Sequence, residues 1–267
     1  MHWVIQNNLY REHNHQILMD TVKRYGIPHT LVELSSLSDV LTPEINVDGL
    51  IYCCGSVKLS RIARNRKWAP GSFLNENHRF EKWVEHWGQH MFNADAVFGD
   101  LGTVVPPLDG EFFIRPCEDT KSFSGKCFYL HEFSKWRQRM LESGCEYIDS
   151  NFVRHKHEAK ADTKVMLSPV KKILSEFRFF VVDGKVVTSS QYKMGGKYYT
   201  NSCVDPYLTD YAQAMVDIWQ PARAFVIDIF NSELGPKIGE INNINCSGFY
   251  DCDVSKLVEA IESMVFP

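Results

Sequence analysis

The chain has 267 residues, of which 44% are hydrophobic and 23% are charged. This is the composition of a folded globular protein, and the length allows one large α/β domain or two small lobes. The formal net charge of −4 gives no general attraction for a phosphodiester backbone, so it argues against a nucleic-acid partner. No segment approaches the roughly 20 consecutive apolar residues of a membrane-spanning helix, so we expect no membrane partner.

The amino-terminal residues lack the charged-then-apolar pattern of a secretory signal peptide. The sequence has eight cysteines but no C-x-x-C pair. Their irregular spacing predicts reduced, mostly buried thiols in a reducing compartment, and it argues against a zinc site. We therefore expect a cytoplasmic protein.

Apolar runs of strand length alternate with helical patterns from residue 1 to about residue 105. This alternation favours a mainly parallel sheet with helices packed against it. The expected strands are residues 4–7, 29–34 and 49–54, and the expected helices are residues 15–25 and 77–91. We therefore predict an α/β lobe over residues 1–105.

From residue 106 the expected strands come in pairs, with helices between the pairs. Asp183-Gly184 is the strongest hairpin signal, because this dipeptide favours the tight turns that join antiparallel strands. The expected strands are residues 111–115, 127–130, 165–167, 175–182, 185–190, 224–230 and 237–245, and the expected helices are residues 131–143, 208–219 and 254–265. Hairpins with separate helices predict an α+β region over residues 106–267.

Asp228 lies within the apolar segment 225–230, which the pattern predicts to be a strand buried on both faces. A buried carboxylate is costly unless a counter-charge or a bound cation compensates it. If the chain reverses symmetrically about Leu234, Asp228 lies opposite Glu240, and Asn242 returns to the same face. Two carboxylates and an amide carbonyl are oxygen ligands of the kind that Mg²⁺ prefers. The alternative is an aspartate paired with an arginine or lysine, and a shift of one residue in the register would also remove this geometry.

A second candidate site lies where an apolar strand ends at Arg115 and enters a turn. Two lysines, Lys121 and Lys126, flank the small residues Ser124 and Gly125 in this turn. Exposed backbone N–H groups and cations suit a triphosphate. The pattern G-x-x-x-x-G-K-[ST] is absent, and a plain basic hairpin turn is the alternative.

Glu176 and Arg178 share one face of the strand 175–182, because side chains on a strand alternate with a period of two. They either pair with each other or point into a cleft, where Arg178 would neutralise phosphate charge. The residues alone leave both interpretations open.

These features occur in the order that is typical of the ATP-grasp superfamily, and the chain resembles the branch of ribosomal-protein glutamate ligases. The matching segments are residues 113–116, 121–125, 168–169, 176–185 and 240–242, together with Asp228. Residues 190–192 and 247–250 also resemble a sub-branch often met in phage genomes. The resemblance covers residues 106–265, and the first lobe matches only in kind. It implies two antiparallel-sheet lobes that clasp the nucleotide, preceded by the α/β lobe.

The resemblance implies ATP and Mg²⁺ as cofactors and gives each candidate residue a role. Arg178 would hold the γ-phosphate or an acyl-phosphate intermediate, while Tyr192 and Lys193 are the nearest candidates for substrate contacts. The implied nucleotide contacts are Arg115, Lys121, Ser124, Gly125, Lys126, Lys164, Met166, Leu167, Ser168 and Glu176, with 124–126 as a closing loop and 166–168 as the hinge around the adenine. The implied metal ligands are Asp228, Glu240 and Asn242. Many family members have lysine where Arg115 stands, but an arginine also neutralises phosphate charge.

The family reaction joins a carboxylate to an amine after ATP has phosphorylated the carboxylate. We therefore expect an ATP- and Mg²⁺-dependent carboxylate–amine ligase, with a peptide or protein as a candidate substrate. Two alternatives keep the same nucleotide site: a kinase for a small molecule or an RNA end, and a regulatory nucleotide-binding module without turnover. Only the ligase predicts ADP release that needs both a carboxylate and an amine.

Overall fold

The computed structural model describes residues 1–9, 13–35, 38–74, 77, 79–106, 110–117, 123–143, 146–148, 154–156 and 159–266. The chain forms two compact units, Met1–Glu76 together with Ile173–Pro267, and Asn77–Lys172. The boundary expected between residues 105 and 106 lies inside the second unit. The reason is that β6 (Val97–Asp100) pairs with β11 (Lys164–Pro169), which ties the end of the expected first lobe to the sheet of the second unit.

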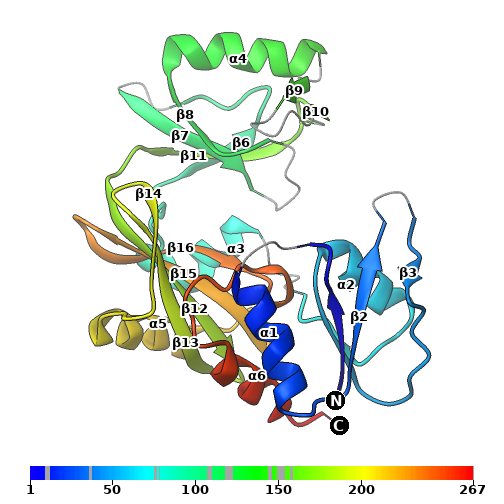
Figure 1. Ribbon diagram of the computed structural model, residues 1–267. Helices are drawn as coiled ribbons and strands as arrows, with labels where there is room; N and C mark the ends of the chain where they lie inside the picture. The colour runs from blue at the N-terminus through cyan, green and yellow to red at the C-terminus, as the bar shows by residue number, and fades with distance from the viewer. Residues whose placement is uncertain are drawn as a thin grey trace. The chain divides into compact units, whose positions relative to one another are not determined.

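The first unit begins with a five-stranded sheet of order β3-β2-β1-β4-β5 (Figure 1). Its elements are β1 (His2–Gln6), α1 (His13–Arg24), β2 (His29–Leu34), β3 (Leu41–Thr42), β4 (Ile51–Cys54), α2 (Val57–Asn65) and β5 (Pro70–Gly71). The central strand β1 runs parallel to β2 and β4, as predicted. Side chains alternate across it: Val4 packs with Leu59 and Ile62 of α2, whereas Trp3 and Ile5 lie in the core on the other face.

The rest of the first unit is an antiparallel sheet of order β14-β13-β12-β15-β16. Its elements are β12 (Ile173–Val182), β13 (Lys185–Met194), β14 (Lys197–Asn201), α5 (Pro206–Ile218), β15 (Ala224–Ser232), β16 (Gly235–Asn242), a 3-10 turn (Ile244–Cys246) and α6 (Val254–Glu262). Both predicted hairpins are confirmed, and Asp183-Gly184 forms the turn of the first with positive φ angles of 43° and 77°. Phe180, Val182 and Val226 on one face join the same core as Trp3.

The second unit has a four-stranded antiparallel sheet of order β6-β11-β7-β8. Its other elements are α3 (Phe80–Trp87), a 3-10 turn (Gly88–His90), β7 (Glu111–Pro116), β8 (Lys126–Tyr129), α4 (Leu130–Ser143), and the separate pair β9 (Glu146–Ile148) with β10 (Arg154–Lys156). Ile114 and Leu167 face α4, where they pack in one core with Phe133 and Met140. In Figure 1, α4 covers this sheet on one side.

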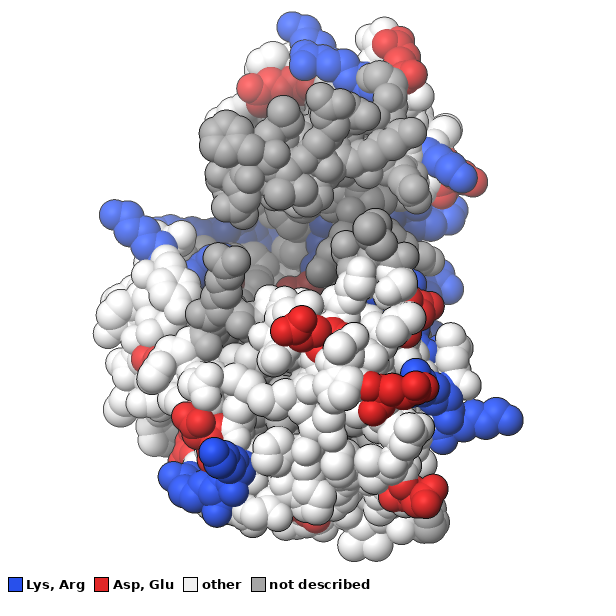
Figure 2. Space-filling model, turned by 45° about the vertical axis from the view of Figure 1, so that its right-hand side comes forward, with Lys and Arg blue, Asp and Glu red and all other residues white. Residues whose placement is uncertain are grey.

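No helix in the described part of the chain is long and apolar enough to cross a membrane. On the face shown in Figure 2, acidic and basic side chains are interspersed with uncharged ones. Charge on this face is therefore mixed in sign.

The cysteines within the described residues are free thiols, and most of them are buried. Burial is the largest cause that raises the pKa of Cys54 and of Cys252, each to about 12. Both thiols therefore stay protonated near neutral pH, which makes them poor nucleophiles. Cys145 lies outside the described residues.

Candidate functional site

Polar side chains from three adjacent strands form a row on the core face of the antiparallel sheet. Arg178 on β12 lies opposite Asp228 on β15, and Asp228 lies opposite Glu240 on β16. Directly opposed residues on neighbouring strands share a face. Asn242 is two residues further along β16, and its Nδ2 lies 3.4 Å from Asp228 Oδ2. The predicted register, with Asp228, Glu240 and Asn242 on one face, is therefore confirmed.

A bulge produces this register, not the symmetric turn that the prediction assumed. The turn between β15 and β16 has two residues and pairs Ser232 with Gly235. A regular ladder from this turn would place Asp228 opposite Gly239. A register shift next to Asp228 moves the pairing by one residue, so that Glu240 takes this position.

We expect Gly239→Ala to lower the free energy of unfolding by about 1–3 kcal/mol. The reason is that an added Cβ would lie 2.2 Å from the ring of Phe230. Urea denaturation followed by circular dichroism measures this loss. In a Phe230→Ala background the same substitution should cost clearly less, because the clash is gone. Equal losses in both backgrounds would contradict the steric explanation.

Arg178 compensates the charge of Asp228, whose side chain is only 1% exposed. Arg178 Nε donates to Oδ1 at 2.9 Å, and Nη2 donates to Oδ2 at 2.8 Å. This bidentate pair is the arginine alternative that the sequence left open. The burial of Asp228 therefore does not by itself predict a metal ion, because a buried guanidinium already balances the carboxylate.

The guanidinium of Arg178 is also enclosed by the segment that follows β16. Its Nη1 donates to the carbonyl of Gly248 at 3.3 Å, and its central carbon lies 5.4 Å and 5.1 Å from the ring centres of Tyr192 and Tyr250. Burial opposes the charged form of Arg178, but the Asp228 carboxylate outweighs it, so that the pKa of Arg178 is raised. Three of its N–H bonds are used by Asp228 and Gly248. A guanidinium has five, so two remain for another acceptor.

Glu176 pairs with side chains of β13, and not with Arg178 as one interpretation of the sequence allowed. Tyr192 Oη donates to Glu176 Oε2 at 2.8 Å, and Lys193 Nζ donates to Oε1 at 3.2 Å. Burial, followed by the nearby Asp228 and Glu176 carboxylates, raises the pKa of Tyr192. The phenol therefore stays protonated near neutral pH and does not serve as a base.

The chemistry of Asp228, Glu240 and Asn242 fits a magnesium ion. A carboxylate has about four lone-pair positions, so Asp228 can accept further contacts besides those from Arg178. Glu240 and Asn242 are only half-buried, which leaves them accessible to a cation. No group of three or more His, Cys, Asp or Glu residues suited to a metal occurs in the described part of the chain. The two carboxylates would therefore act with the amide oxygen of Asn242 and with water.

Four predicted nucleotide contacts share one face of the sheet in the second unit. Lys164, Met166 and Ser168 alternate on β11 with residues that face the core around α4, and Arg115 on β7 lies opposite Met166. Lys164 Nζ lies 2.6 Å from Asp100 Oδ1. The Ser168 hydroxyl is buried and has no hydrogen-bond partner among the described residues. A buried hydroxyl in this state favours a polar ligand at that position.

The other predicted contacts in the second unit are not on this face. The side chain of Leu167 packs in the core, so only its backbone remains for a ligand. Lys126 lies opposite a core-facing residue of β7, and therefore on the opposite face from Arg115. Ser124 and Gly125 are exposed just before β8, and Lys121 lies outside the described residues.

Sequence reasoning missed two contacts of Arg178, at Gly248 and Tyr250. Both lie in the run 247–250, for which the sequence offers only a resemblance. Tyr250 has a positive φ of 51°, and its ring stacks on that of Tyr192 with centres 4.9 Å apart. An unfavourable backbone conformation in a tyrosine marks this position as one that the surrounding structure constrains.

An α/β sheet, two antiparallel sheets and this polar row define a protein with the ATP-grasp fold. A family model described as an ATP-grasp domain, the third family of its clade, matches residues 57–261, and the chain belongs to this family. This result confirms the superfamily and the fold that the sequence predicted. No curated protein matches the chain.

Solved structures show the same fold at low sequence identity. A RimK domain ATP-grasp protein from Sphaerobacter thermophilus is 10% identical, with a TM-score of 0.59 and coverage of 92% of both chains. D-alanine–D-alanine ligase from Bacillus anthracis is 11% identical, with a TM-score of 0.62 and coverage of 98% of this chain and 96% of that chain. The ATP-grasp ligase PsnB, in complex with minimal precursor, Mg and ADP, is 10% identical, with a TM-score of 0.53 and coverage of 98% and 97%.

Proposed function

We propose that this protein is an ATP- and Mg²⁺-dependent ligase that joins a carboxylate to an amine through an acyl-phosphate. The carrying observation is the register that gathers Asp228, Glu240 and Asn242 on one face beside Arg178. Membership of an ATP-grasp family supports the use of ATP. Two of the similar structures are ligases, and one of these holds Mg and ADP.

In this proposal Asp228, Glu240 and Asn242 hold Mg²⁺, which neutralises phosphate charge when it is bound. Arg178 keeps the Asp228 carboxylate in a fixed orientation, since both oxygens accept from one planar guanidinium. Its two remaining N–H bonds are offered to an oxygen of the γ-phosphate or of the acyl-phosphate. Lys193, whose side chain is 44% exposed, is a candidate contact for an anionic substrate.

The residues of the second unit have a separate role in the proposal. Arg115 binds phosphate, while Met166 and Ser168 contact the base, where the hydroxyl of Ser168 gains the partner that it lacks. Lys164 is held by Asp100 and is proposed to approach the nucleotide from the same face. The remaining predicted contacts are kept as backbone or loop contacts, and these are Lys121, Ser124, Gly125, Lys126 and Leu167.

The protein contributes positioning and charge neutralisation to this reaction, with little covalent chemistry of its own. Tyr192 is protonated and bonded to Glu176, so we assign it a structural role beside Arg178. The amine is therefore expected to arrive neutral or to lose its proton to solvent.

The test is an ADP-release screen with ATP and Mg²⁺ against amino acids and peptides, combined with mass spectrometry of the products. We expect ADP only where a carboxylate and an amine are both present, with a product formed by loss of water. A kinase would instead add a phosphoryl group to a hydroxyl compound, and a regulatory module would release no ADP with any compound. Asp228→Asn and Glu240→Gln are the controls, and undiminished ADP release in both variants would remove the proposed metal site.

A further inference from the structure

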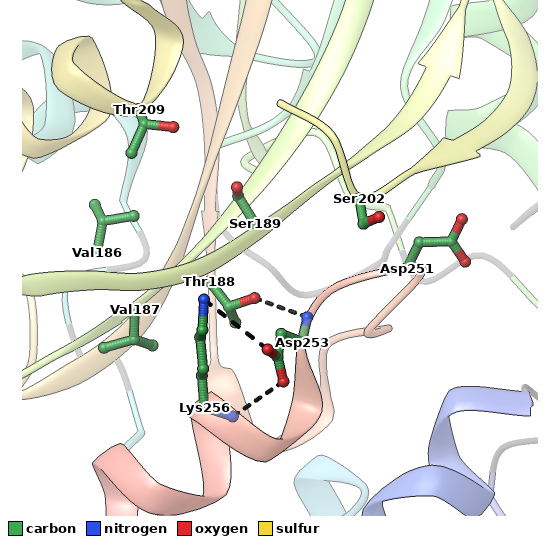
Figure 3. A pocket seen from close by; sticks show the side chains of 9 residues that line it. All are labelled: Val186, Val187, Thr188, Ser189, Ser202, Thr209, Asp251, Asp253 and Lys256. Atoms are coloured by element: carbon green, nitrogen blue, oxygen red, sulfur yellow. Dashed lines mark hydrogen bonds and ion pairs between the residues drawn. The ribbon is translucent and has the colours of Figure 1, made fainter. Parts of the chain in front are cut away.

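The first unit contains a cavity of about 540 Å³ that is separate from the polar row (Figure 3). A volume of this size is in the range of sites that bind small ligands and short peptides. The residues that line it come from β13, from the start of α5, and from the segment that leads into α6. They are Val186, Val187, Thr188, Ser189, Ser202, Thr209, Asp251, Asp253 and Lys256.

One wall of the cavity is the outer edge of β13, which lacks a partner strand over part of its length. In the sheet order, β14 is the neighbour of β13 on this side, but it pairs only with residues from Gln191 to Met194. The edge formed by residues 186–190 is therefore not paired with any strand among the described residues. The Val186 N–H is satisfied by the Gln213 side chain, and the rest of the edge faces the cavity. An unpaired edge of this kind offers backbone N–H and C=O groups to an extended chain.

The opposite wall is fixed in place by hydroxyl groups of β13. Thr188 Oγ1 accepts a hydrogen bond from the backbone N–H of Asp253 at 2.8 Å, and Ser190 Oγ accepts one from that of Asp251 at 3.1 Å. These bonds hold the segment before α6 at a set distance from the strand. The cavity is thus a groove with two anchored sides, and not a gap that closes by collapse of the loop.

The charges in the groove favour a basic ligand. Asp253 caps α6 by accepting from the Lys256 N–H, and its other oxygen lies 3.9 Å from Lys256 Nζ, so these two charges offset each other. The carboxylate of Asp251 has no hydrogen-bond or ion-pair partner among the described residues. In Figure 3, Asp251 and Ser202 lie toward one end of the groove, away from Lys256. One carboxylate at that end therefore remains uncompensated.

We propose that this groove binds a short extended peptide that pairs with the free edge of β13 and places a lysine or arginine side chain on Asp251. The backbone edge provides affinity that is independent of peptide sequence, and Asp251 provides the preference for a basic residue. Binding at this groove does not depend on the proposed ligase activity.

The test is an NMR titration of ¹⁵N-labelled full-length protein, without ATP, with the peptide acetyl-VTKTV-amide. We expect shifts of the amides of Thr188, Ser189 and Asp251, and a Kd about fivefold higher in Asp251→Asn. Asp210→Asn is the matched control, because this exposed carboxylate of α5 does not line the groove. Its Kd should equal that of the unmodified protein.

Two further probes separate the backbone contribution from the charge contribution. The peptide acetyl-VPKPV-amide cannot donate the same backbone hydrogen bonds, so it should bind at least fivefold more weakly. N-acetyl-lysinamide carries the charge without an extended backbone and should bind weakly as well. Equal Kd values for the single lysine and the peptide would overturn the peptide assignment, and so would an unchanged Kd in Asp251→Asn. Because ATP is absent, either failure leaves the proposed function untouched.

Discussion

Glu240→Gln is expected to lower the rate of ATP-dependent turnover by about 10²–10³-fold, with a change in the free energy of unfolding below about 1 kcal/mol. The substitution keeps the shape of the side chain and removes one of the two carboxylate charges on this face. Glu240 is half-buried, and the bidentate partner of Asp228 is Arg178, so the buried ion pair stays intact. The loss should therefore fall on cation binding and not on folding.

A titration with Mg²⁺ at saturating ATP measures this loss, and Mn²⁺ binding followed by paramagnetic relaxation gives a second readout that does not depend on turnover. Glu233→Gln is the matched control, since Glu233 is exposed in the turn of the same hairpin. It should leave both measurements unchanged. A Glu240→Gln protein with the turnover and the Mn²⁺ affinity of the unmodified protein would show that this glutamate binds no metal.

The second large effect is expected from Arg178→Met, which should lower the free energy of unfolding by about 3–5 kcal/mol. The variant leaves the Asp228 carboxylate buried without its counter-charge. The double variant Arg178→Met/Asp228→Leu removes both charges, so most of the stability should return while ATP-dependent turnover stays absent. Urea denaturation of the single and double variants gives both free energies.

An exposed pair with the same geometry supplies the control. Arg223 Nε and Nη2 donate to the two oxygens of Asp183 at 2.7 Å and 2.6 Å, but both side chains are more than 40% exposed. Arg223→Met should therefore cost less than about 1 kcal/mol. Similar losses in Arg178→Met and Arg223→Met would mean that burial of the Arg178–Asp228 pair has little energetic weight.

Local patterns in the sequence predicted most of the secondary structure around the site. The dipeptide Asp183-Gly184 set the turn between β12 and β13, and the apolar run around Asp228 predicted a buried strand. Both features depend on residues close together in the chain, where turn preference and side-chain alternation act. Helix α2 and strand β6 were not predicted. The pairing that gives β6 its place in a sheet is with β11, more than sixty residues away in the sequence.

The register of β15 with β16 shows where sequence reasoning reached the right pair by the wrong route. The prediction rests on a turn symmetric about Leu234, but the turn has two residues and a bulge at Gly239 restores the pairing of Asp228 with Glu240. A bulge of one residue leaves little local signal, because it depends on how the ring of Phe230 packs over the strand.

The sequence by itself determined that a carboxylate would lie in a buried strand and that a glutamate and an asparagine would share its face. It also determined the family, through the order of motifs that each had little specificity alone. Only the tertiary structure decided what balances Asp228, because Arg178 is fifty residues away along the chain and reaches it across two paired strands. Charge compensation depends on distance in space, whereas a sequence specifies directly only which residues are neighbours along the backbone.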